Sequence, residues 1–434
     1  MFPISQEILT KTASELGIID ISTATIRQIV ALSTALEKEA DEKFVHLELG
    51  NPGLPASAIG IDAEIAALQA GVANTYPAIN GIPELKKAGK RFVKAFMDID
   101  VPEKAIVPTV GSMQASFTLQ LLLSQRIPGR DTILFFNPGF PAQRHQAKVL
   151  GLGIEQFDIY NFRNAALEAK LEEILSDGKV TAMLFSNPNN PSWINLTEEE
   201  LEIIGKMATK HDVIVIEDLA YLGMDFRTDF SHPFEAPFIP SVGKYTDNFI
   251  MLVSGSKIFS YAGQRIAIAA MSKYVYDRQY EFFTKFYEMP AFGDAYIFGV
   301  LYTASSGTTH SAQYALAAMM NAACDGKLDF VKETSEYGRR AEIMKKCFCD
   351  NGFHIVYDMD GDTPISDGFF FTVGYRDLDG KTLQTELLRH GVSAITLEST
   401  GSEQDGVRIC VSTLSKSEDF DILAQRLKAF KNEH

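Results

Sequence analysis

From residue 105 onward, short apolar runs alternate with stretches of helical periodicity, and this alternation constrains the fold more than any other feature of the chain. The apolar runs predict buried strands at residues 106–110, 132–136, 180–185, 213–217, 249–254 and 265–271. Helical patterns lie between them at residues 114–124, 142–150 and 198–210. Strands that alternate with helices form a mostly parallel sheet with helices on both faces. We therefore predict an α/β fold.

The rest of the chain has a different pattern. Helices are predicted at residues 22–37, 84–95, 330–351 and 418–431, short strands near 45–53, 369–373 and 407–412, and an irregular insertion at 226–248. The later segments form a smaller α+β unit, which the N-terminal helices would help to complete. We predict an N-terminal arm and part of the small domain in residues 1–48, a large domain in 49–325 and a small domain in 326–434.

Composition excludes several classes of function. With 434 residues and 46% hydrophobic side chains, the chain can bury the core of two domains. A net charge of -16 argues against a nucleic-acid partner, because no basic excess is present to displace counterions. No apolar run is long enough to span a bilayer, so we expect no membrane partner.

The N-terminus and the cysteines indicate a cytoplasmic protein. Residues 1–7 lack the basic and apolar regions of a signal peptide. The four cysteines are Cys324, Cys347, Cys349 and Cys410, and their spacing matches neither a zinc site nor a CxxC motif. We expect reduced thiols and no metal site.

Lys257 is the strongest single candidate for chemistry. It follows the apolar run 249–253, with Ser254 and Ser256 just before it and Arg265 eight positions after it. Poor solvation at the end of a buried strand lowers the pKa of a lysine, which can then act as a Schiff-base nucleophile. An isolated lysine at a strand edge is more often simply solvated, but the flanking serines and arginine favour the active interpretation.

The first two predicted strands end in residues suited to an anion and to a flat ring. Gly111, Ser112 and Met113 open a helix, where free backbone N–H groups and the helix dipole can hold a phosphate. Phe140 places an aromatic ring at the end of the next strand. Taken singly, the first is more often a turn with a helix cap and the second ordinary packing.

The next two strands end in an amide, an acid and a phenol. Asn190 lies in an Asn-Pro turn, and Asp218 ends a buried run with Tyr221 three residues later. A buried carboxylate needs a partner, so a cationic ligand atom is plausible beside Asp218. Because ligands of such sheets bind at the carboxyl ends of the strands, these groups together describe a pocket for pyridoxal phosphate.

At this point the chain resembles the fold-type I aminotransferases of classes I and II, the aspartate aminotransferase-like group. The resemblance covers residues 47–413 and rests on motifs at 75–77, 81–85, 110–115, 187–191, 218–221, 254–265 and 407–412. It implies a mostly parallel sheet of seven strands in the large domain. It also implies pyridoxal 5'-phosphate as the cofactor.

The resemblance also implies a role for each candidate residue. Lys257 would carry the aldimine, Asp218 would pair with the ring nitrogen, and Tyr221 and Asn190 would bond the phenolic oxygen. Phe140 would stack on the ring. The phosphate would be met by Gly111, Ser112, Met113, Ser254, Ser256 and Arg265, and by Tyr76 from the neighbouring subunit of a homodimer. The substrate carboxylate would be held by Arg408, with Asn190 and the backbone near Gly50.

The implied function is transfer of an amino group between an L-amino acid and a 2-oxo acid, 2-oxoglutarate or pyruvate, in amino acid metabolism. A C–S β-lyase, or another enzyme that forms a Cα carbanion, would need the same residues and remains an alternative. A ligand-sensing domain within a DNA-binding regulator is disfavoured, because residues 1–45 carry no basic cluster that could contact DNA. The family usually has glycine at the position of Trp193 and often has glycine at the position of Ala267. We expect Trp193 to alter its turn and to narrow the substrate pocket.

Overall fold

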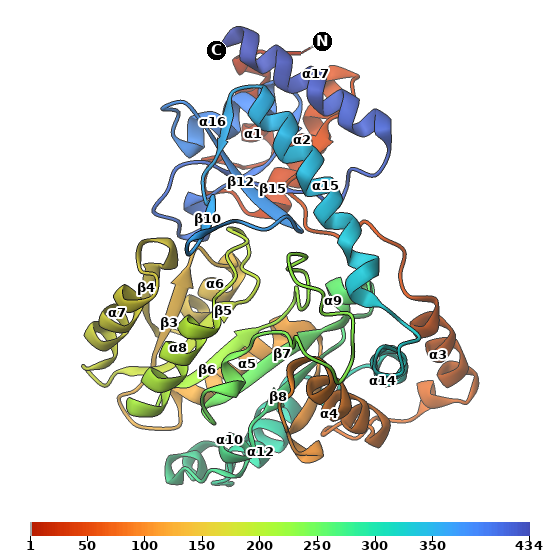
Figure 1. The fold of residues 1–434 in the computed structure, drawn as a ribbon, viewed down its shortest axis with the longest axis vertical. Coiled ribbons are helices and arrows are strands. Elements are labelled where there is room, and N and C mark those ends of the chain that lie inside the picture. Colours follow the sequence, from red (N-terminus) through yellow and green to blue (C-terminus); the bar gives the residue numbers. More distant parts are fainter. Residues whose placement is uncertain (1) are drawn as a thin grey trace.

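The computed structural model describes residues 2–434, which form two bodies stacked one above the other (Figure 1). The large domain, as we use the term, holds the elements from α3 to α14. The small domain holds α1, α2, β1 and everything from β9 to the end of the chain. Helix α15 (Phe330–Asp350) runs along the small domain down to the large one, and both termini lie in the small domain. The boundaries at residues 48 and 325 remain a proposal.

A seven-stranded sheet forms the centre of the large domain, in the order β2-β8-β7-β6-β5-β3-β4. Its strands are β2 (Ile106–Thr109), β3 (Thr132–Asn137), β4 (Gly153–Asp158), β5 (Val180–Ser186), β6 (Ile214–Asp218), β7 (Phe249–Ser254) and β8 (Ala267–Met271). Neighbours from β7 to β4 are parallel, whereas β8 is antiparallel to both β7 and β2. Strand β2 therefore runs in the common direction, and its carboxyl end lies on the same edge as those of β5, β6 and β7. The predicted fold class is confirmed.

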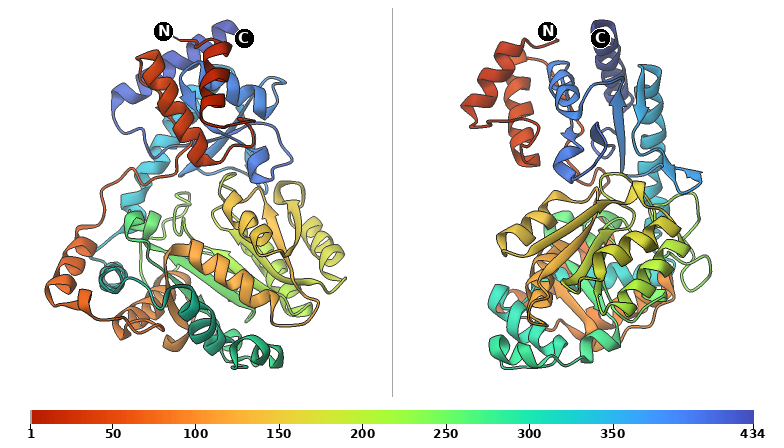
Figure 2. Two further views of the ribbon diagram at one scale, coloured as in Figure 1. Left: turned by 180° about the vertical axis from the view of Figure 1, so that it is seen from behind. Right: turned by 90° about the vertical axis from the view of Figure 1, so that its left-hand side faces the viewer.

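Helices cover both faces of this sheet (Figures 1 and 2). They are α3 (Ala58–Gln69), α4 (Pro83–Met97), α5 (Gly111–Ser124), α6 (Pro141–Val149), α7 (Ala165–Leu175), α8 (Glu198–Lys210) and α14 (His310–Cys324). Shorter ones are α9 (Gly255–Ile258), α10 (Lys273–Asp277), α11 (Thr284–Tyr287), α12 (Phe292–Asp294), the π-helix Ala295–Leu301 and α13 (Tyr302–Ser305).

Successive residues of a strand point to opposite faces and divide the core in two. On β7, Ile250 and Leu252 pack in one cluster with α5 and the π-helix, whereas Met251 and Val253 pack in the other with α4 and α8. The second cluster continues into the small domain without a break. The two domains therefore share buried apolar surface.

The small domain is built on an antiparallel sheet in the order β14-β15-β12-β9. Its strands are β9 (Phe353–Ile355), β12 (Phe370–Tyr375), β14 (Ile395–Thr396) and β15 (Val407–Cys410), and β10 (Met359–Asp360) pairs with β11 (Thr363–Pro364) in a hairpin. The N-terminal segment joins it through β1 (Val45–His46), which pairs with β13 (Val392–Ser393). Its remaining helices are α1 (Gln6–Glu15), α2 (Ile26–Ala40), α16 (Gly380–Arg389) and α17 (Ser417–Glu433).

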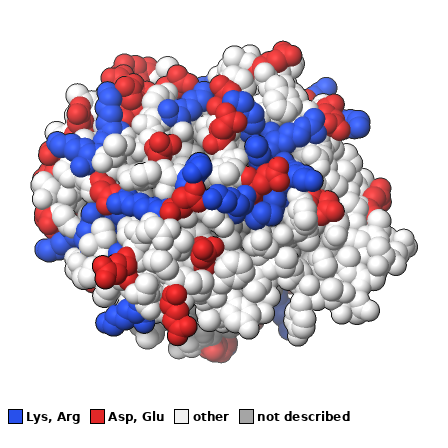
Figure 3. All heavy atoms as spheres, turned by 90° about the horizontal axis from the view of Figure 1, so that it is seen from below, with Lys and Arg blue, Asp and Glu red and all other residues white. Residues whose placement is uncertain are grey.

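The face of the protein that is seen from below carries charges of both signs. Lysine and arginine alternate there with aspartate and glutamate, and a broad area at the right of the view carries few charges (Figure 3). Among residues 2–434, no helix is both long enough and apolar enough to cross a membrane.

Candidate active site

Lys257 lies in α9, immediately after β7, at the carboxyl edge of the sheet. Its amine donates a hydrogen bond to the carbonyl oxygen of Gly50 and sits 5.1 Å above the ring of Phe369. Burial lowers the pKa of Lys257 to about 8, and the positive charges of Arg408 and Arg265 act in the same direction. A large fraction of this amine is therefore neutral near pH 8, as a nucleophile must be.

Asp218 ends β6, the neighbouring strand, and its side chain is buried. One carboxylate oxygen, Oδ2, accepts a hydrogen bond of 2.8 Å from the amide of Gln143, while Oδ1 has no hydrogen-bond partner in the described chain. Burial raises the pKa of Asp218 to about 6. A buried carboxylate oxygen without a donor is costly, and a protonated ring nitrogen would satisfy it. The site thus fits pyridoxal phosphate at this point.

Gln143 is a residue that the sequence reasoning missed. It lies in the first turn of α6, three residues after Phe140, and is itself buried. A small hollow at the ends of β3 and β5 is lined by Phe140, Gln143 and Ser186, among others. The available signal was its position, because the first helical turn after a strand faces the same edge as the strand end.

Gly111 and Arg265 approach each other at the end of β2. Gly111 has a φ of +67°, and a Cβ atom there would lie 2.6 Å from Nη2 of Arg265. Only glycine therefore allows the guanidinium to reach the start of α5, where the backbone N–H groups of Ser112 and Met113 have no partner within the helix. An arginine against a helix N-terminus is suited to a phosphate group. Ser254 and Ser256 share a 3.0 Å hydrogen bond at the start of α9.

Arg408 comes from β15 of the small domain and is almost completely buried. Nη1 lies 3.2 Å from Oδ1 of Asn190, Nη2 donates to the carbonyl oxygen of Glu48, and Nε has no partner in the described chain. The guanidinium also lies 4.5 Å above the ring of Phe370. Burial lowers the pKa of Arg408. A buried cation whose hydrogen bonds go to neutral oxygens is suited to a carboxylate ligand.

The remaining candidates are placed differently from one another. Tyr221 is buried, which raises its pKa, and it packs edge-on against Phe370 at 5.4 Å. Phe140 is half-buried at the start of α6. Tyr76 stands apart, with 90% of its side chain exposed. The strand-end candidates therefore lie at one edge of the large sheet, Arg408 reaches Asn190 from the small domain, and Tyr76 stands apart.

Trp193 has a backbone conformation that a side chain of its kind rarely adopts. Its φ of +67° is the left-handed conformation that favours glycine, so the backbone is one that glycine adopts without strain. The indole is fully buried and lies so close to Gly368 that a Cβ there would be 2.0 Å from the ring. Trp193 also packs edge-on against Tyr221 at 5.5 Å. The glycine at 368 makes the room that the tryptophan occupies.

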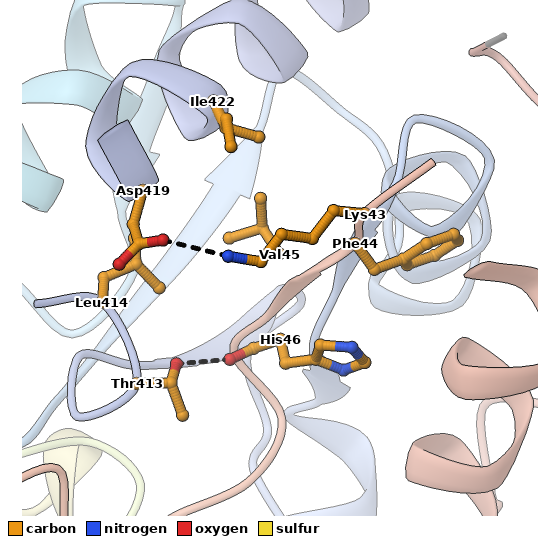
Figure 4. A pocket seen from close by; sticks show the side chains of 8 residues that line it. All are labelled: Lys43, Phe44, Val45, His46, Thr413, Leu414, Asp419 and Ile422. Atoms are coloured by element: carbon orange, nitrogen blue, oxygen red, sulfur yellow. Dashed lines mark hydrogen bonds and ion pairs between the residues drawn. The ribbon is translucent and has the colours of Figure 1, made fainter. Parts of the chain in front are cut away.

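A second hollow lies in the small domain and contains none of the predicted residues (Figure 4). Lys43 and Asp419 form an ion pair of 3.1 Å across it, and the hydroxyl of Thr413 donates to the carbonyl oxygen of His46. Both interactions join the N-terminal segment to the C-terminal part of the small domain, which indicates a structural contact. Within residues 2–434, no group of three or more histidine, cysteine or acidic residues is arranged to hold a metal ion.

Comparison with known proteins identifies the family. A sequence profile described as aminotransferase class I and II matches residues 43–427. Nicotianamine aminotransferase 1 of Oryza sativa is 29% identical over 217 residues, 48% of this chain and 41% of that protein. The asparagine–oxo-acid transaminase of Streptococcus mutans is 26% identical over 249 residues, 55% of this chain and 61% of that protein. The matched region thus spans about half the length of these curated relatives.

Solved structures show the same fold at lower identity. A single mutant of Thermus thermophilus aspartate aminotransferase superposes with a TM-score of 0.76 at 17% identity, covering 94% of this chain and 97% of that one. A Mycobacterium tuberculosis aminotransferase gives a TM-score of 0.75 at 18% identity, covering 94% and 96%. The profile match extends over most of the sequence, and the fold agrees along nearly all of it. The chain therefore belongs to the family of class I and II aminotransferases.

Proposed function

We propose that this protein is a pyridoxal-phosphate-dependent aminotransferase that moves an amino group between an L-amino acid and a 2-oxo acid. The observation that carries the proposal is the placement of Lys257 and Arg408 around one segment. The amine binds the carbonyl of Gly50, and the guanidinium binds the carbonyl of Glu48, two residues earlier. An α-amino acid carries its amino group and carboxylate on one carbon and would engage both sites together.

The residues that would hold the cofactor surround this pair. Lys257 would hold it through the amine, Asp218 would keep the ring nitrogen protonated, and Phe140 would pack on the ring face. Asn190 and Tyr221 would donate to its phenolic oxygen. Its phosphate would be held by Gly111, Ser112, Met113, Ser254, Ser256 and Arg265. When bound, pyridoxal phosphate supplies an electron sink for the charge that develops at the substrate Cα.

The chain's own residues then divide the work of proton transfer and orientation. The amine of Lys257, neutral through its low pKa, would take the Cα proton and later give it back, acting first as a general base and then as a general acid. The forked guanidinium of Arg408 fixes the substrate carboxylate, and with it the direction of the Cα–H bond. Asp218 stays ionised near neutral pH beside a cationic partner, because an opposite charge offsets the burial that raises its pKa.

We also propose that the protein is a homodimer with shared sites. Tyr76 is almost fully exposed, and the nearby helix α3 exposes Ile61, Ile65 and Leu68. The charge-poor area at the right of Figure 3 lies on the side where Figure 1 draws α3. Burial of this apolar surface against a second copy would bring Tyr76 toward that copy's phosphate site. Light scattering would test the dimer, and Ile65→Asp on the exposed face should weaken it.

The test of the reaction uses the cofactor's absorbance after amino acid is added alone, without any oxo acid. A stable shift to the pyridoxamine form, together with one equivalent of oxo acid, is the expected result. Release of pyruvate and sulfide from cysteine, without that shift, would instead indicate the C–S lyase. A screen of amino donors with 2-oxoglutarate and with pyruvate would then define the substrate pair.

A further inference from the structure

The small domain contacts the turn that carries Asn190. Asp360, on the β10–β11 hairpin, reaches the backbone N–H of Asn195 with both carboxylate oxygens, each at 3.2 Å. Its side chain is only 3% exposed. Figure 1 draws β10 at the lower edge of the small domain, facing the large one. The contact therefore exists only while the small domain is docked on the large domain.

Two further contacts hold the same turn. The indole of Trp193 lies against Gly368, and the side-chain amide of Asn195 donates to the hydroxyl of Ser366 at 3.3 Å. Gly368 and Ser366 precede β12 and belong to the small domain. The small domain thus contacts this short segment of the large domain in two places, through Asp360 and through Ser366 and Gly368.

Internal hydrogen bonds link the residues of this turn to one another. The N–H of Asn189 donates to the carbonyl of Ile194 at 2.9 Å, and the N–H of Trp193 donates to the carbonyl of Asn189 at 3.0 Å. The amide oxygen of Asn189 accepts from Ser192 as well. Displacement of Asn195 would therefore displace Asn190, whose Oδ1 lies 3.2 Å from Arg408.

We propose that Asp360 is a positioning residue, which sets the geometry of Asn190 and Arg408 for the substrate carboxylate by holding Asn195. The inference rests on the proposed function and extends it to a residue of a distant hairpin. According to this proposal, the arrangement that binds the substrate carboxylate is held in place while the small domain is docked on the large domain.

Asp360 can be replaced without leaving Arg163 or Arg227 unpaired. Asp360 also accepts from Arg163 at 3.2 Å and from Arg227 at 2.7 Å. Arg163 keeps Glu200 at 2.5 Å, and Arg227 keeps Asp225 at 2.6 Å. Since both arginines retain a carboxylate, the Asp360→Ala protein is expected to fold. Asp225→Ala is a matched control, because it removes a carboxylate from Arg227 without touching the turn.

The first test measures carboxylate binding. In the loaded enzyme, Asp360→Ala should weaken the affinity for a 2-methyl amino acid, which has no Cα hydrogen to lose, by about tenfold, as expected for a lost hydrogen bond to a charged group. KM for the donor should rise more than kcat falls. Asp360→Asn should lie between wild type and Asp360→Ala, because its amide oxygen can still accept from Asn195. Unchanged affinity, or an equal loss in Asp225→Ala, would overturn the proposal.

The second test needs no activity, because Trp193 is the only tryptophan. Acrylamide should quench its fluorescence poorly in wild type and in Asp225→Ala, and more efficiently in Asp360→Ala. Equal quenching in all three proteins would show that Asp360 does not hold the turn. If the wild type forms no oxo acid from any donor, the proposed function fails. In that case, quenching and ligand affinity still judge Asp360 separately.

Discussion

Lys257 and Arg408 bind carbonyl oxygens that lie two residues apart, at Gly50 and Glu48. One residue follows a strand of the large sheet, and the other belongs to a strand of the small domain. The segment between the domains therefore brings an amine and a guanidinium to one place, although 151 positions separate them in the chain. This arrangement carries the proposed recognition of an α-amino acid.

Arg408→Lys should impair substrate binding. A lysine cannot reproduce the fork that would hold a carboxylate with two hydrogen bonds. Loss of one charged hydrogen bond, about 1.5–3 kcal/mol, should raise KM for the amino donor by about tenfold or more and also lower kcat. Steady-state kinetics measure both values. Arg340→Lys is a suitable control, because Arg340 is also buried but pairs with Glu336; equal effects in the two variants would remove Arg408 from the site.

The capture of pyridoxal phosphate by the apoprotein should depend on the titration of Lys257. Its pKa is lowered to about 8, so the amine is protonated and unreactive below that pH and neutral above it. The rate of capture should rise with pH and level off above about 8, which stopped-flow absorbance can follow. A rate that keeps rising toward the ordinary lysine pKa of 10.5 would show that the amine is not desolvated.

Glu217→Gln should stabilise the protein at neutral and alkaline pH. Burial raises the pKa of Glu217 from 4.5 to about 7, and its donors, Ser241 and the backbone of Val242, are neutral. Since the folded pKa lies above the unfolded one, the contribution of Glu217 to stability is fully present below pH 4.5 and is lost as pH rises through 7. The variant should avoid about 3 kcal/mol of that loss, at about 1.4 kcal/mol per pKa unit.

Denaturant unfolding at pH 5 and pH 8 would measure this difference. Glu200→Gln should change stability in the opposite direction, because Glu200 pairs with Arg163 at 2.5 Å and its pKa is lowered. Its contribution is present above the unfolded pKa and is lost in acid. If both substitutions changed the stability in the same direction, the opposite pKa shifts of Glu217 and Glu200 would be contradicted.

Trp193→Gly should destabilise the protein despite its relaxed backbone. Truncation of a core tryptophan costs about 3–5 kcal/mol, and relief of the left-handed conformation returns about 1–2 kcal/mol. A net loss of about 1–4 kcal/mol is expected in denaturant unfolding. Trp193→Phe should lose less, since it keeps an aromatic ring against Gly368. No loss in the glycine variant would show that the indole contributes nothing to domain contact.

Most of the large sheet could be predicted from the sequence, because its central strands are buried on both faces and read as apolar runs. Strand β4 escaped because it lies at the sheet edge, where Glu155 and Gln156 are exposed. Helix α14 escaped for the opposite reason, since it is buried almost all round and shows no polar stripe. The antiparallel direction of β8 is also invisible in an apolar run.

The strand-end candidates could be predicted because each follows a strand, and parallel strands deliver their ends to one edge. Asp360 could not be predicted. It lies 165 positions from Asn195, in a hairpin of two-residue strands, and only tertiary contact joins them. The conformation of Trp193 was also missed, because the residue type argues against a left-handed backbone and only packing on Gly368 explains it.

The central claim is that Lys257 forms the bond to the cofactor. The most direct test is the mass of the protein after loading with pyridoxal phosphate and reduction with borohydride, compared between Lys257→Ala and Lys86→Ala. Lys86 is a fair control, because burial lowers its pKa to about 8 as well, while its amine binds the backbone carbonyls of Asn80 and Ile106. We predict one phosphopyridoxyl group on Lys257 in wild type and in Lys86→Ala, and none in Lys257→Ala. A full equivalent of label retained by Lys257→Ala would contradict the account.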